Sequence, residues 1–579
     1  MKKLENTNTK NYFFSNLLIS YFVNFGVKYA FISPGSRNTS LTQAIINNKD
    51  IKSFSIIDER SSAYVGLGKT KSDSLNRPVL IITTSGTAVA NLFPAIVESF
   101  MSKVPMIVIS ADRPNRLIGT GSNQTIYQNN IFGKYAQFFD LTNHINKVEK
   151  YFKDFNKNNY ENELYRYIKK IYKTSIYGTK KSIIGNEFNP SPVHLNIPYD
   201  EPLFYNGDLF KFNQIKVPKI KAKRKFSLIS KKLGHKNSKI LIICTDLGDL
   251  SLIKACNKYH IPIFMESRSS KYGKKYKNII TSYDNIIKYF DIKPDIILRF
   301  GSRPVSKKLN QLIDINKKNT YLLQGHQEKE YEPCWIDTSK IEQYFELNKK
   351  TIDVKWCNSL IQFQKKIKME IESFFSKPRF HEGYVINQII KGLPKKTNLL
   401  IGNSSPIRDL DSYTFNMDKK IKVFSNRGAS GIDGLISTAI GMSIDQSCYN
   451  ALITGDVSFY YDLTALNIIK NIPVCLTIFI INNSGGHIFD RLDSLSTQRK
   501  SNYEKFWLTN PNVDFKDVAK VFGCSYYKIN LNDDKQIIKS IHKLNNTERN
   551  IRLIELEVDA KKHHSNEKDL NKKIKKIFI

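Results

Sequence analysis

Two apolar runs near the C-terminal end of the chain each lead into a polar side chain that can bind a cation. Residues 451–454 lead into Asp456, and residues 475–481 lead into Asn483. Short continuous apolar runs of this kind are typical of buried strands in parallel sheets. The segment between them exceeds the roughly one dozen residues that a crossover between parallel strands needs. The sequence therefore predicts neighbouring parallel strands whose carboxyl ends present an acid and an amide.

These two side chains form an oxygen-donor pair suited to a hard divalent cation such as Mg²⁺ or Mn²⁺. Asp456 would supply a charged oxygen, Asn483 an amide oxygen, and Gly485 a backbone carbonyl. Diphosphate oxygens and water would complete the shell, since Mg²⁺ usually combines a few protein ligands with phosphates. The plainer interpretation is an ordinary turn after each strand, because isolated Gly-Asp and Asn-Asn pairs are common.

Strand-like runs alternate with helical patterns along the chain, which predicts an α/β protein. We expect three doubly wound parallel-sheet domains, over residues 1–203, 204–376 and 377–579. Ligands of such sheets lie outside the carboxyl ends of the strands. The expected strands are 29–32, 54–57, 79–83, 106–110 and 192–198 in the first domain, 240–244, 261–265, 295–299 and 320–323 in the second, and 398–401, 422–424, 451–454, 475–481 and 553–558 in the third.

Other segments are expected to flank or connect these domains. The N-terminal apolar stretch is broken by polar residues and predicts a helix rather than a secretion signal. The Lys-rich residues 206–225 are expected to form a linker, and residues 354–375 a long helix. We expect no concentrated chemistry in the second domain and a solvated basic tail from Lys561 onward.

The formal net charge is +36, and lysines are spread along the whole chain. Such a charge is typical of nucleic-acid-binding proteins. However, no nucleic-acid-binding module accompanies it, and the abundance of Lys, Asn, Ile, Tyr and Phe is better explained by AT-rich codons. We therefore expect no nucleic-acid partner, although the charge would attract anionic substrates or surfaces.

The seven cysteines are scattered, and none forms a CxxC pair. This pattern predicts reduced core thiols rather than a disulfide framework or a zinc site. No apolar run approaches the ~20 residues that a transmembrane helix needs. We expect a cytoplasmic protein without integral membrane association.

Several motifs resemble thiamine-diphosphate enzymes, in particular the family of 2-succinyl-5-enolpyruvyl-6-hydroxy-3-cyclohexene-1-carboxylate synthases of menaquinone biosynthesis. The spacing of Asp456 and Asn483 is similar to their diphosphate-binding motif, and Val457-Ser458 matches the aliphatic residue and serine common in this family. The resemblance spans the first and third domains and is weak in the second. The other segments that carry it are SPGSR at 33–37, DERS at 58–61, TSGTAVAN at 84–91, SADRP at 110–114, SNRGASGIDG at 425–434 and GGHIF at 485–489.

The resemblance implies that 2-oxoglutarate is decarboxylated and that its succinyl carbanion equivalent adds to isochorismate. The implied cofactors are thiamine diphosphate, as electron sink, and Mg²⁺ or Mn²⁺. Glu59 is the implied catalytic residue, because a carboxyl group against the pyrimidine ring favours the imino tautomer. The plainer interpretation of Glu59 is a surface carboxylate paired with Arg60. Because this family joins Glu59 and the diphosphate site across a subunit interface, we expect a homodimer or homotetramer.

The resemblance also implies binding roles. Ile432 matches the aliphatic side chain under the bent coenzyme, and arginines suit substrate carboxylates because their planar fork binds them bidentately. The plainer interpretation of each arginine is a weak surface salt bridge. The implied coenzyme contacts are Glu59, Ser404, Ile432, Gly455, Asp456, Val457, Ser458, Asn483 and Ile488. The implied substrate contacts are Ser36, Arg37, Arg113, Asn123 and Gln124 for isochorismate, and Ser404, Arg408, Arg427, Ile488 and Phe489 for the succinyl group.

Two other functions stay open on the sequence. One is a different thiamine-diphosphate enzyme, such as acetolactate synthase or a simple 2-oxo acid decarboxylase. The Arg-rich loops argue against it, because pyruvate-type substrates have no distal carboxylate. The other is a basic nucleic-acid or membrane-surface protein, which salt-sensitive binding to random DNA would identify.

Overall fold

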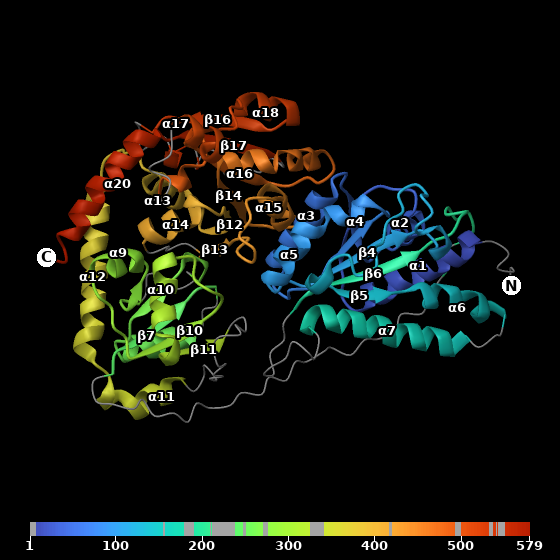
Figure 1. Ribbon diagram of the computed structural model, residues 1–579, viewed down its shortest axis with the longest axis horizontal. Helices are drawn as coiled ribbons and strands as arrows, with labels where there is room; N and C mark the ends of the chain where they lie inside the picture. Colours follow the sequence, from blue (N-terminus) through green and yellow to red (C-terminus); the bar gives the residue numbers. More distant parts are fainter. Residues whose placement is uncertain are drawn as a thin grey trace. The chain divides into compact units, whose positions relative to one another are not determined.

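Three parallel β-sheets organise the chain, and helices connect their strands (Figure 1). The computed structural model describes residues 7–153, 157–178, 190–208, 210, 238–246, 250–269, 276–324, 341–415, 420–491, 500–531, 537–539, 541 and 550–579. The strands of each sheet come from one stretch of the sequence, and they pair in parallel. The predicted α/β fold with three parallel-sheet domains is confirmed.

The chain forms two compact units whose composition does not follow the sequence order. Unit 1 contains Met1–Arg224, Asn426–Gln446 and Tyr461–Val474, and unit 2 contains Lys225–Ser425, Ser447–Tyr460 and Cys475–Ile579. Two segments that follow strands of the third sheet therefore pack with the first sheet. The predicted boundaries at residues 203 and 376 stay a prediction, since compactness groups these segments differently.

The sheet of unit 1 has the strand order β2-β1-β3-β4-β6-β5. The chain moves outward from β1 to β2 and then returns past β1 to β3, so the order reverses between β1 and β3. Ligands of open α/β sheets bind at such a switch point. The strands are β1 (Tyr29–Ile32), β2 (Lys52–Ser55), β3 (Leu80–Thr83), β4 (Met106–Asp112), β5 (Gln137–Asp140) and β6 (Pro192–Pro198). The edge strand β5 was not predicted.

Helices α3 (Glu59–Ser72) and α15 (Leu435–Ser443) pack extensively against each other in unit 1. A Cβ atom at Gly68 would overlap the carbonyl of Thr438, and one at Gly441 would overlap the carbonyl of Val65. Glycine therefore allows the two backbones to touch. The other helices are α1 (Thr7–Asn24), which confirms the predicted N-terminal helix, α2 (Thr39–Ile46), α4 (Thr87–Asn91), α5 (Phe93–Met101), α6 (Thr142–Lys153), α7 (Lys157–Tyr177) and a 3₁₀ helix at Leu463–Lys470.

Unit 2 contains the other two sheets, with strand orders β11-β10-β7-β8-β9 and β13-β12-β14-β15-β17-β16. The middle strands are β7 (Ile240–Cys244), β8 (Ile263–Met265), β9 (Ile279–Ile280), β10 (Ile296–Phe300) and β11 (Thr320–Gln324). The last sheet comprises β12 (Lys396–Ile401), β13 (Lys420–Phe424), β14 (Tyr449–Gly455), β15 (Leu476–Asn482), β16 (Ser525–Ile529) and β17 (Ile551–Glu557). Most predicted strands agree within two residues, while the short β9 and the half-exposed β16 were missed.

The helices of unit 2 include one that corrects the sequence analysis. Residues from Lys561 onward were expected to form a solvated tail, but most of them belong to helix α20 (Ala560–Lys575), which packs on α12 (Val354–Phe374). Leu570 and Ile574 are buried in the core of unit 2, because apolar side chains four residues apart share one helix face. The remaining longer helices are α8 (Leu250–Lys258), α9 (Tyr283–Tyr289), α10 (Lys307–Ile315), α11 (Ile341–Asn348), α13 (Glu382–Gly392), α14 (Ser405–Tyr413), α16 (Asp456–Tyr461) and α18 (Phe515–Phe522).

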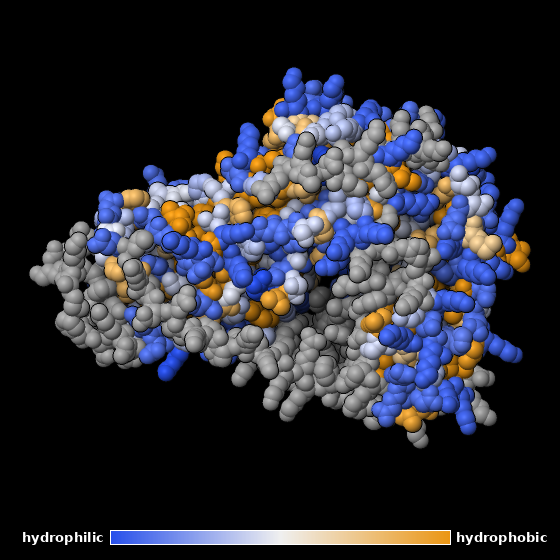
Figure 2. All heavy atoms as spheres, turned by 180° about the vertical axis from the view of Figure 1, so that it is seen from behind, coloured by the Kyte–Doolittle hydropathy of each residue, from blue (hydrophilic) through white to orange (hydrophobic). Residues whose placement is uncertain are grey.

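Further expectations concern the surface, the cysteines, membrane-spanning helices and the predicted linker. Figure 2 shows hydrophilic side chains over most of the coloured surface of one face, with smaller hydrophobic groups between them. The described cysteines are free thiols, of which Cys244, Cys256 and Cys357 are buried as predicted, whereas Cys448, Cys475 and Cys524 are only half-buried. Cys334 lies outside the described residues. Among the helices that the structure describes, none has the length and apolar character to cross a bilayer. Most of the predicted linker, 206–225, also lies outside the described residues.

Candidate functional site

The carboxyl ends of β14 and β15 bring the predicted cation ligands to one edge of the last sheet. The two strands pair in parallel, with Gly455 opposite Ile481. Asp456 begins helix α16 directly after β14, and Asn483 follows β15 directly. The neighbouring parallel strands expected from the two apolar runs are thus confirmed.

Asp456 joins the two loops through backbone hydrogen bonds. Its Oδ2 accepts a bond from the N–H of Gly485 at 2.7 Å, and its Oδ1 accepts one from the N–H of Val457 at 2.8 Å. The residue is buried, and this burial raises the pKa of its carboxyl group to about 6. A buried carboxylate is costly unless a positive charge compensates it, so the site suits a cation.

Asn483 presents an amide oxygen that has no partner in the described part of the chain. Its Nδ2 donates to Oε1 of Glu382 at 2.7 Å, while its Oδ1 is buried without a hydrogen bond. Gly485 follows with a φ of +136°, and a Cβ atom there would lie 2.6 Å from the carbonyl oxygen of Leu508. A turn that only glycine can form thus places the loop beside Asp456.

The donor set fits a magnesium-type cation. One carboxylate, one orphaned amide oxygen and a nearby backbone carbonyl are hard oxygen donors, and Mg²⁺ commonly takes its remaining ligands from phosphates and water. Among the described residues, no group of three or more His, Cys, Asp or Glu side chains could hold a metal by itself.

Ser404 and Arg408 lie at the end of the neighbouring strand, β12. Ser404 has φ +70° and ψ −129°, a backbone conformation that residues other than glycine rarely adopt. Arg408 donates from Nη1 to the carbonyl of Ser404. Strain of this kind persists only where surrounding structure imposes it, and it clusters at functional sites. Helix α14 then begins at Ser405, so its first turn carries Arg408.

Ile488 and Phe489 lie in a short 3₁₀ helix, His487–Arg491, that follows the glycine turn. The N–H of Phe489 donates to the carbonyl of Gly486 at 3.1 Å. Val457 and Ser458 lie in the first turn of α16. The structure thus assembles, within unit 2, the predicted residues Ser404, Arg408, Gly455, Asp456, Val457, Ser458, Asn483, Gly485, Ile488 and Phe489.

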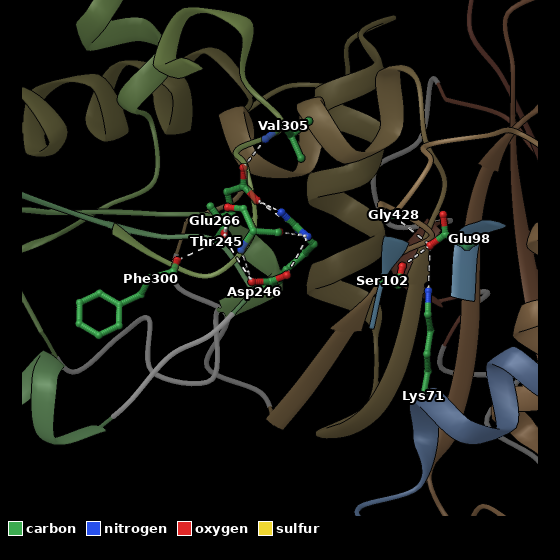
Figure 3. A network of polar contacts seen from close by, with 11 residues as sticks. Lys71, Glu98, Ser102, Thr245, Asp246, Glu266, Phe300, Val305 and Gly428 are labelled. Carbon is green, nitrogen blue, oxygen red and sulfur yellow. Dashed lines mark hydrogen bonds and ion pairs between the residues drawn. The ribbon is translucent and has the colours of Figure 1, made fainter. Parts of the chain in front are cut away.

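The middle sheet holds a buried charged network that the sequence analysis did not expect (Figure 3). Arg268 donates from Nη2 to Oε2 of Glu266 at 2.5 Å, and Glu266 also accepts from the N–H of Val305. Ser267 donates to Asp411 of helix α14 through its N–H, at 2.8 Å, and through its hydroxyl group. Burial, reinforced by the charge of Glu266, raises the pKa of Asp411. The network anchors the helix that carries Arg408. The expectation of no concentrated chemistry in the second domain stays a prediction.

In unit 1, two buried arginines converge at the switch point of the first sheet. Arg37, after β1, donates from Nη1 to the carbonyl of Tyr199 at 2.9 Å and pairs through Nη2 with Glu201, while its Nε is buried without a partner among the described residues. Arg113, after β4, donates from Nη1 to the hydroxyl of Ser85. Burial and the charge of Arg37 lower the pKa of Arg113. Two close cations, one of which has an unpartnered Nε–H donor, suit an anionic ligand.

Three predicted neighbours of these arginines lie on loops of the same unit. Ser36 precedes Arg37 and is exposed, as are Asn123 and Gln124. Gln124 has φ +51° and lies against Gly86. A Cβ atom added to Gly86 would lie 3.2 Å from the carbonyl oxygen of Gln124. The loop after β3 therefore contacts both Gln124 and, through Ser85, Arg113.

Glu59 begins helix α3 after strand β2, at the carboxyl end of the first sheet. Asn91 donates from Nδ2 to its Oε2 at 3.4 Å. The alternative pairing with Arg60 is not what forms: Arg60 approaches Asp462 at 3.7 Å and donates to the carbonyl of Tyr461. Glu59 is therefore held by a neutral amide rather than by a cation.

The segment with Arg427 and Ile432 also packs in unit 1. Asp433, beside Ile432, accepts a bond from the hydroxyl of Tyr64 at 2.6 Å, and Tyr64 lies on α3, the helix that begins with Glu59. Unit 1 thus holds the predicted residues Ser36, Arg37, Glu59, Arg113, Asn123, Gln124, Arg427 and Ile432. Sequence reasoning missed Glu382, because a single buried carboxylate at the start of a helix gives no motif.

Comparison with known proteins identifies two thiamine-pyrophosphate-binding domains, the second of which contributes segments to both compact units. Residues 14–131 match a model described as thiamine pyrophosphate enzyme, N-terminal TPP binding domain, and residues 409–555 match the corresponding C-terminal TPP binding domain.

Several relatives, among them the following three, carry the name 2-succinyl-5-enolpyruvyl-6-hydroxy-3-cyclohexene-1-carboxylate synthase. The Bacillus pumilus protein is 30% identical over 96% of this chain and 97% of its own length. The Listeria innocua and Staphylococcus aureus proteins are each 31% identical, over 88% and 87% of this chain and 89% and 88% of their own lengths.

Proposed function

The chain belongs to the family of 2-succinyl-5-enolpyruvyl-6-hydroxy-3-cyclohexene-1-carboxylate synthases, and from this premise we propose that it decarboxylates 2-oxoglutarate and adds the succinyl unit to isochorismate. The products are the compound for which the family is named and CO₂, in a step of menaquinone biosynthesis. Similarity over nearly the full lengths of chain and relatives supports the proposal, since it includes the middle sheet as well as the two matched domains.

The proposed cofactors are thiamine diphosphate, which supplies an electron sink for decarboxylation and carbon–carbon bond formation, and Mg²⁺ or Mn²⁺. Asp456, Asn483 and the carbonyl of Gly485 would hold the cation. The backbone bonds to Asp456 fix its carboxylate, and Glu382 fixes the amide of Asn483. Further coenzyme contacts are proposed for Ser404, Gly455, Val457, Ser458 and Ile488.

Glu59 is the proposed catalytic residue. Its carboxyl group would exchange a proton with the pyrimidine ring nitrogen, and Asn91 would hold the side chain in place. Ile432 would support the bent form of the coenzyme. The bond between Asp433 and Tyr64 supports this pairing, because it ties the segment with Ile432 to the helix that begins with Glu59.

The arginines provide the substrate specificity in this proposal. Arg37 and Arg113, with Ser36, Asn123 and Gln124, would bind the carboxylates of isochorismate. The succinyl group would be held by Ser404, Arg408, Arg427, Ile488 and Phe489. The closeness of the buried Arg37 and Arg113 is the observation that best supports isochorismate as the acceptor. Two buried guanidinium groups suit an acceptor with two carboxylates, whereas a pyruvate-type acceptor has one.

The assembly and its location form part of the proposal. Glu59 and Asp456 lie in different compact units, and in the proposed homodimer or homotetramer they meet across a subunit interface. The free buried cysteines favour a reducing compartment, which supports a cytoplasmic location.

One assay tests the proposed function. The protein is incubated with thiamine diphosphate, Mg²⁺, 2-oxoglutarate and isochorismate, and the consumption of isochorismate is followed with release of CO₂. We expect both to proceed together, and omission of isochorismate to reduce CO₂ release strongly. Unchanged isochorismate, or equal turnover of pyruvate in place of 2-oxoglutarate, would overturn the proposal.

A further inference from the structure

A buried ion pair in unit 1, Glu98 with Lys71, binds the loop that carries Arg427; Figure 3 shows the pair with Ser102 and Gly428. Glu98, on helix α5, is 2% exposed, and Lys71, near the end of α3, approaches its Oε1 at 3.3 Å. The side chain of Lys71 is only 9% exposed. Burying such a pair costs several kcal/mol of desolvation per ion, so it gives little net stability. The pair therefore calls for another explanation than stability.

The carboxylate of Glu98 binds two successive backbone amides of the loop. Oε1 accepts from the N–H of Gly428 at 3.0 Å, and Oε2 accepts from the N–H of Ala429 at 2.7 Å. Ser102 donates its hydroxyl to Oε1 at 2.5 Å. Charge-assisted bonds to both oxygens fix the loop in position and in rotation.

Lys71 holds the other side of Arg427. Its Nζ donates to Oδ1 of Asn426 at 2.8 Å, and Nδ2 of Asn426 donates to the hydroxyl of Thr438 on α15 at 2.9 Å. The residues on both sides of Arg427 are thus bonded to the same ion pair. Arg427 is the one residue between these two anchors.

The backbone of the loop lies in direct contact with helix α5. A Cβ atom at Gly428 would lie 2.6 Å from the hydroxyl oxygen of Ser102 and 2.7 Å from the carbonyl oxygen of Glu98. Ser430, two residues on, has φ +64°. A loop this closely seated has little freedom to shift, so the direction of the Arg427 side chain follows from the position of the ion pair.

We propose that Glu98 and Lys71 form a latch that positions Arg427 for the carboxylate of the 2-oxo acid. The assignment of Arg427 to that carboxylate rests on the proposed function; the latch itself rests on the bonds above. Glu98 acts through Arg427 and is a positioning residue, since it binds the loop backbone rather than the substrate. The site is fixed before substrate binds, which lowers the entropic cost of orienting the carboxylate.

The first test measures the loop without any substrate. Hydrogen exchange at the amides of Gly428 and Ala429 is compared in the wild-type protein, Glu98→Gln and the control Asp73→Asn, which removes the ion pair of Asp73 with Arg77 in the same unit. We expect exchange at these amides to accelerate by at least about tenfold in Glu98→Gln and to stay unchanged in Asp73→Asn. Unchanged exchange in Glu98→Gln would overturn the latch.

The second test measures its consequence for catalysis. In Glu98→Gln we expect kcat/KM for 2-oxoglutarate to fall at least about tenfold, with KM for isochorismate within about twofold of the wild-type value. In an Arg427→Ala background the same substitution should have no further effect. An equal loss in that background would show a general structural role and overturn the proposal. If Glu98→Gln does not fold, Ser102→Ala removes one donor and should give a smaller change of the same pattern.

The two tests separate the latch from the proposed function. If the wild-type protein consumes no isochorismate, the proposed function is refuted. The exchange measurement still decides whether the ion pair holds the loop. If the wild-type protein is active but Glu98→Gln shows unchanged exchange and unchanged kinetics, only the proposed latch is refuted.

Discussion

The Nδ2 atom of Asn483 donates to Oε1 of Glu382 at 2.7 Å, and this bond determines the orientation of the amide. A carboxylate can only accept, so the nitrogen of the amide must face Glu382 and the oxygen must face away. That oxygen is buried without a partner in the described residues. Glu382, which no motif identifies, thereby leaves Oδ1 available for a cation beside Asp456.

Asn483→Ala should weaken binding of Mg²⁺, because it removes one oxygen ligand. Glu382→Ala should weaken it by about 10–100-fold, as expected for a residue that orients a metal ligand. Titration of thiamine diphosphate binding against Mg²⁺ concentration measures both effects. Asn450→Ala, at the opposite end of β14, is the matched control and should leave the titration unchanged. Wild-type Mg²⁺ dependence in Asn483→Ala would remove this residue from the proposed site.

Glu59→Gln should retain coenzyme binding and lose turnover by about 10²–10⁴-fold, the usual contribution of a positioned proton-transfer group. The amide keeps the shape of the side chain and its contact with Asn91, but it cannot exchange a proton. Coenzyme binding and single-turnover rates are measured on the same preparation. A variant that binds the coenzyme and turns over at the wild-type rate would exclude Glu59 as the catalytic residue.

The sequence predicted those parts of the site that depend on strand ends. Asp456 and Asn483 follow long apolar runs, and the parallel pairing of those runs places them at one edge whatever the details of packing. Glu59, Arg37 and Arg113 were identified by the family resemblance rather than by strand position, and in the structure each follows a strand of the first sheet.

The residues that position these groups could not be predicted in the same way. Glu98 and Glu382 are carboxylates within helices, and their partners lie far away in the sequence, at Gly428 and Asn483. Helix α20 was missed for a related reason: its lysines dominate the composition, while only Leu570 and Ile574 show which face is buried. Long-range packing, rather than local pattern, decides these cases.

Arg408→Ala should lower kcat/KM for 2-oxoglutarate, and the loss should correspond to about 2–4 kcal/mol of transition-state stabilisation. This is the cost of leaving a charged partner unpaired. Arg408→Lys should recover only part of the loss, because an ammonium group cannot reproduce the bidentate fork. Steady-state kinetics with each substrate varied in turn separate the effects, and KM for isochorismate should change little. An unchanged apparent affinity for 2-oxoglutarate in Arg408→Ala would place this arginine elsewhere in the reaction.

The stability of the cofactor-free protein should fall on acidification in a way that depends on His194. This ring is buried, its Nε2 lies 2.7 Å from Oγ of Ser110, and burial lowers its pKa from 6.5 to about 3. The unfolded chain therefore binds the proton first, and the folded protein is penalised between pH 6.5 and about 3. The penalty is absent above pH 6.5 and grows by roughly 1.4 kcal/mol per pH unit as the pH falls below it.

His194→Gln removes this titrating group while keeping a polar side chain beside Ser110. We expect the variant to be less stable than the wild-type protein at pH 7.5, where neutral His194 packs well, but to lose stability less steeply between about pH 6.5 and 4.5. Urea denaturation at a series of pH values gives both slopes. Parallel slopes for the two proteins would mean that His194 binds its proton equally in the folded and unfolded states, and would contradict this prediction.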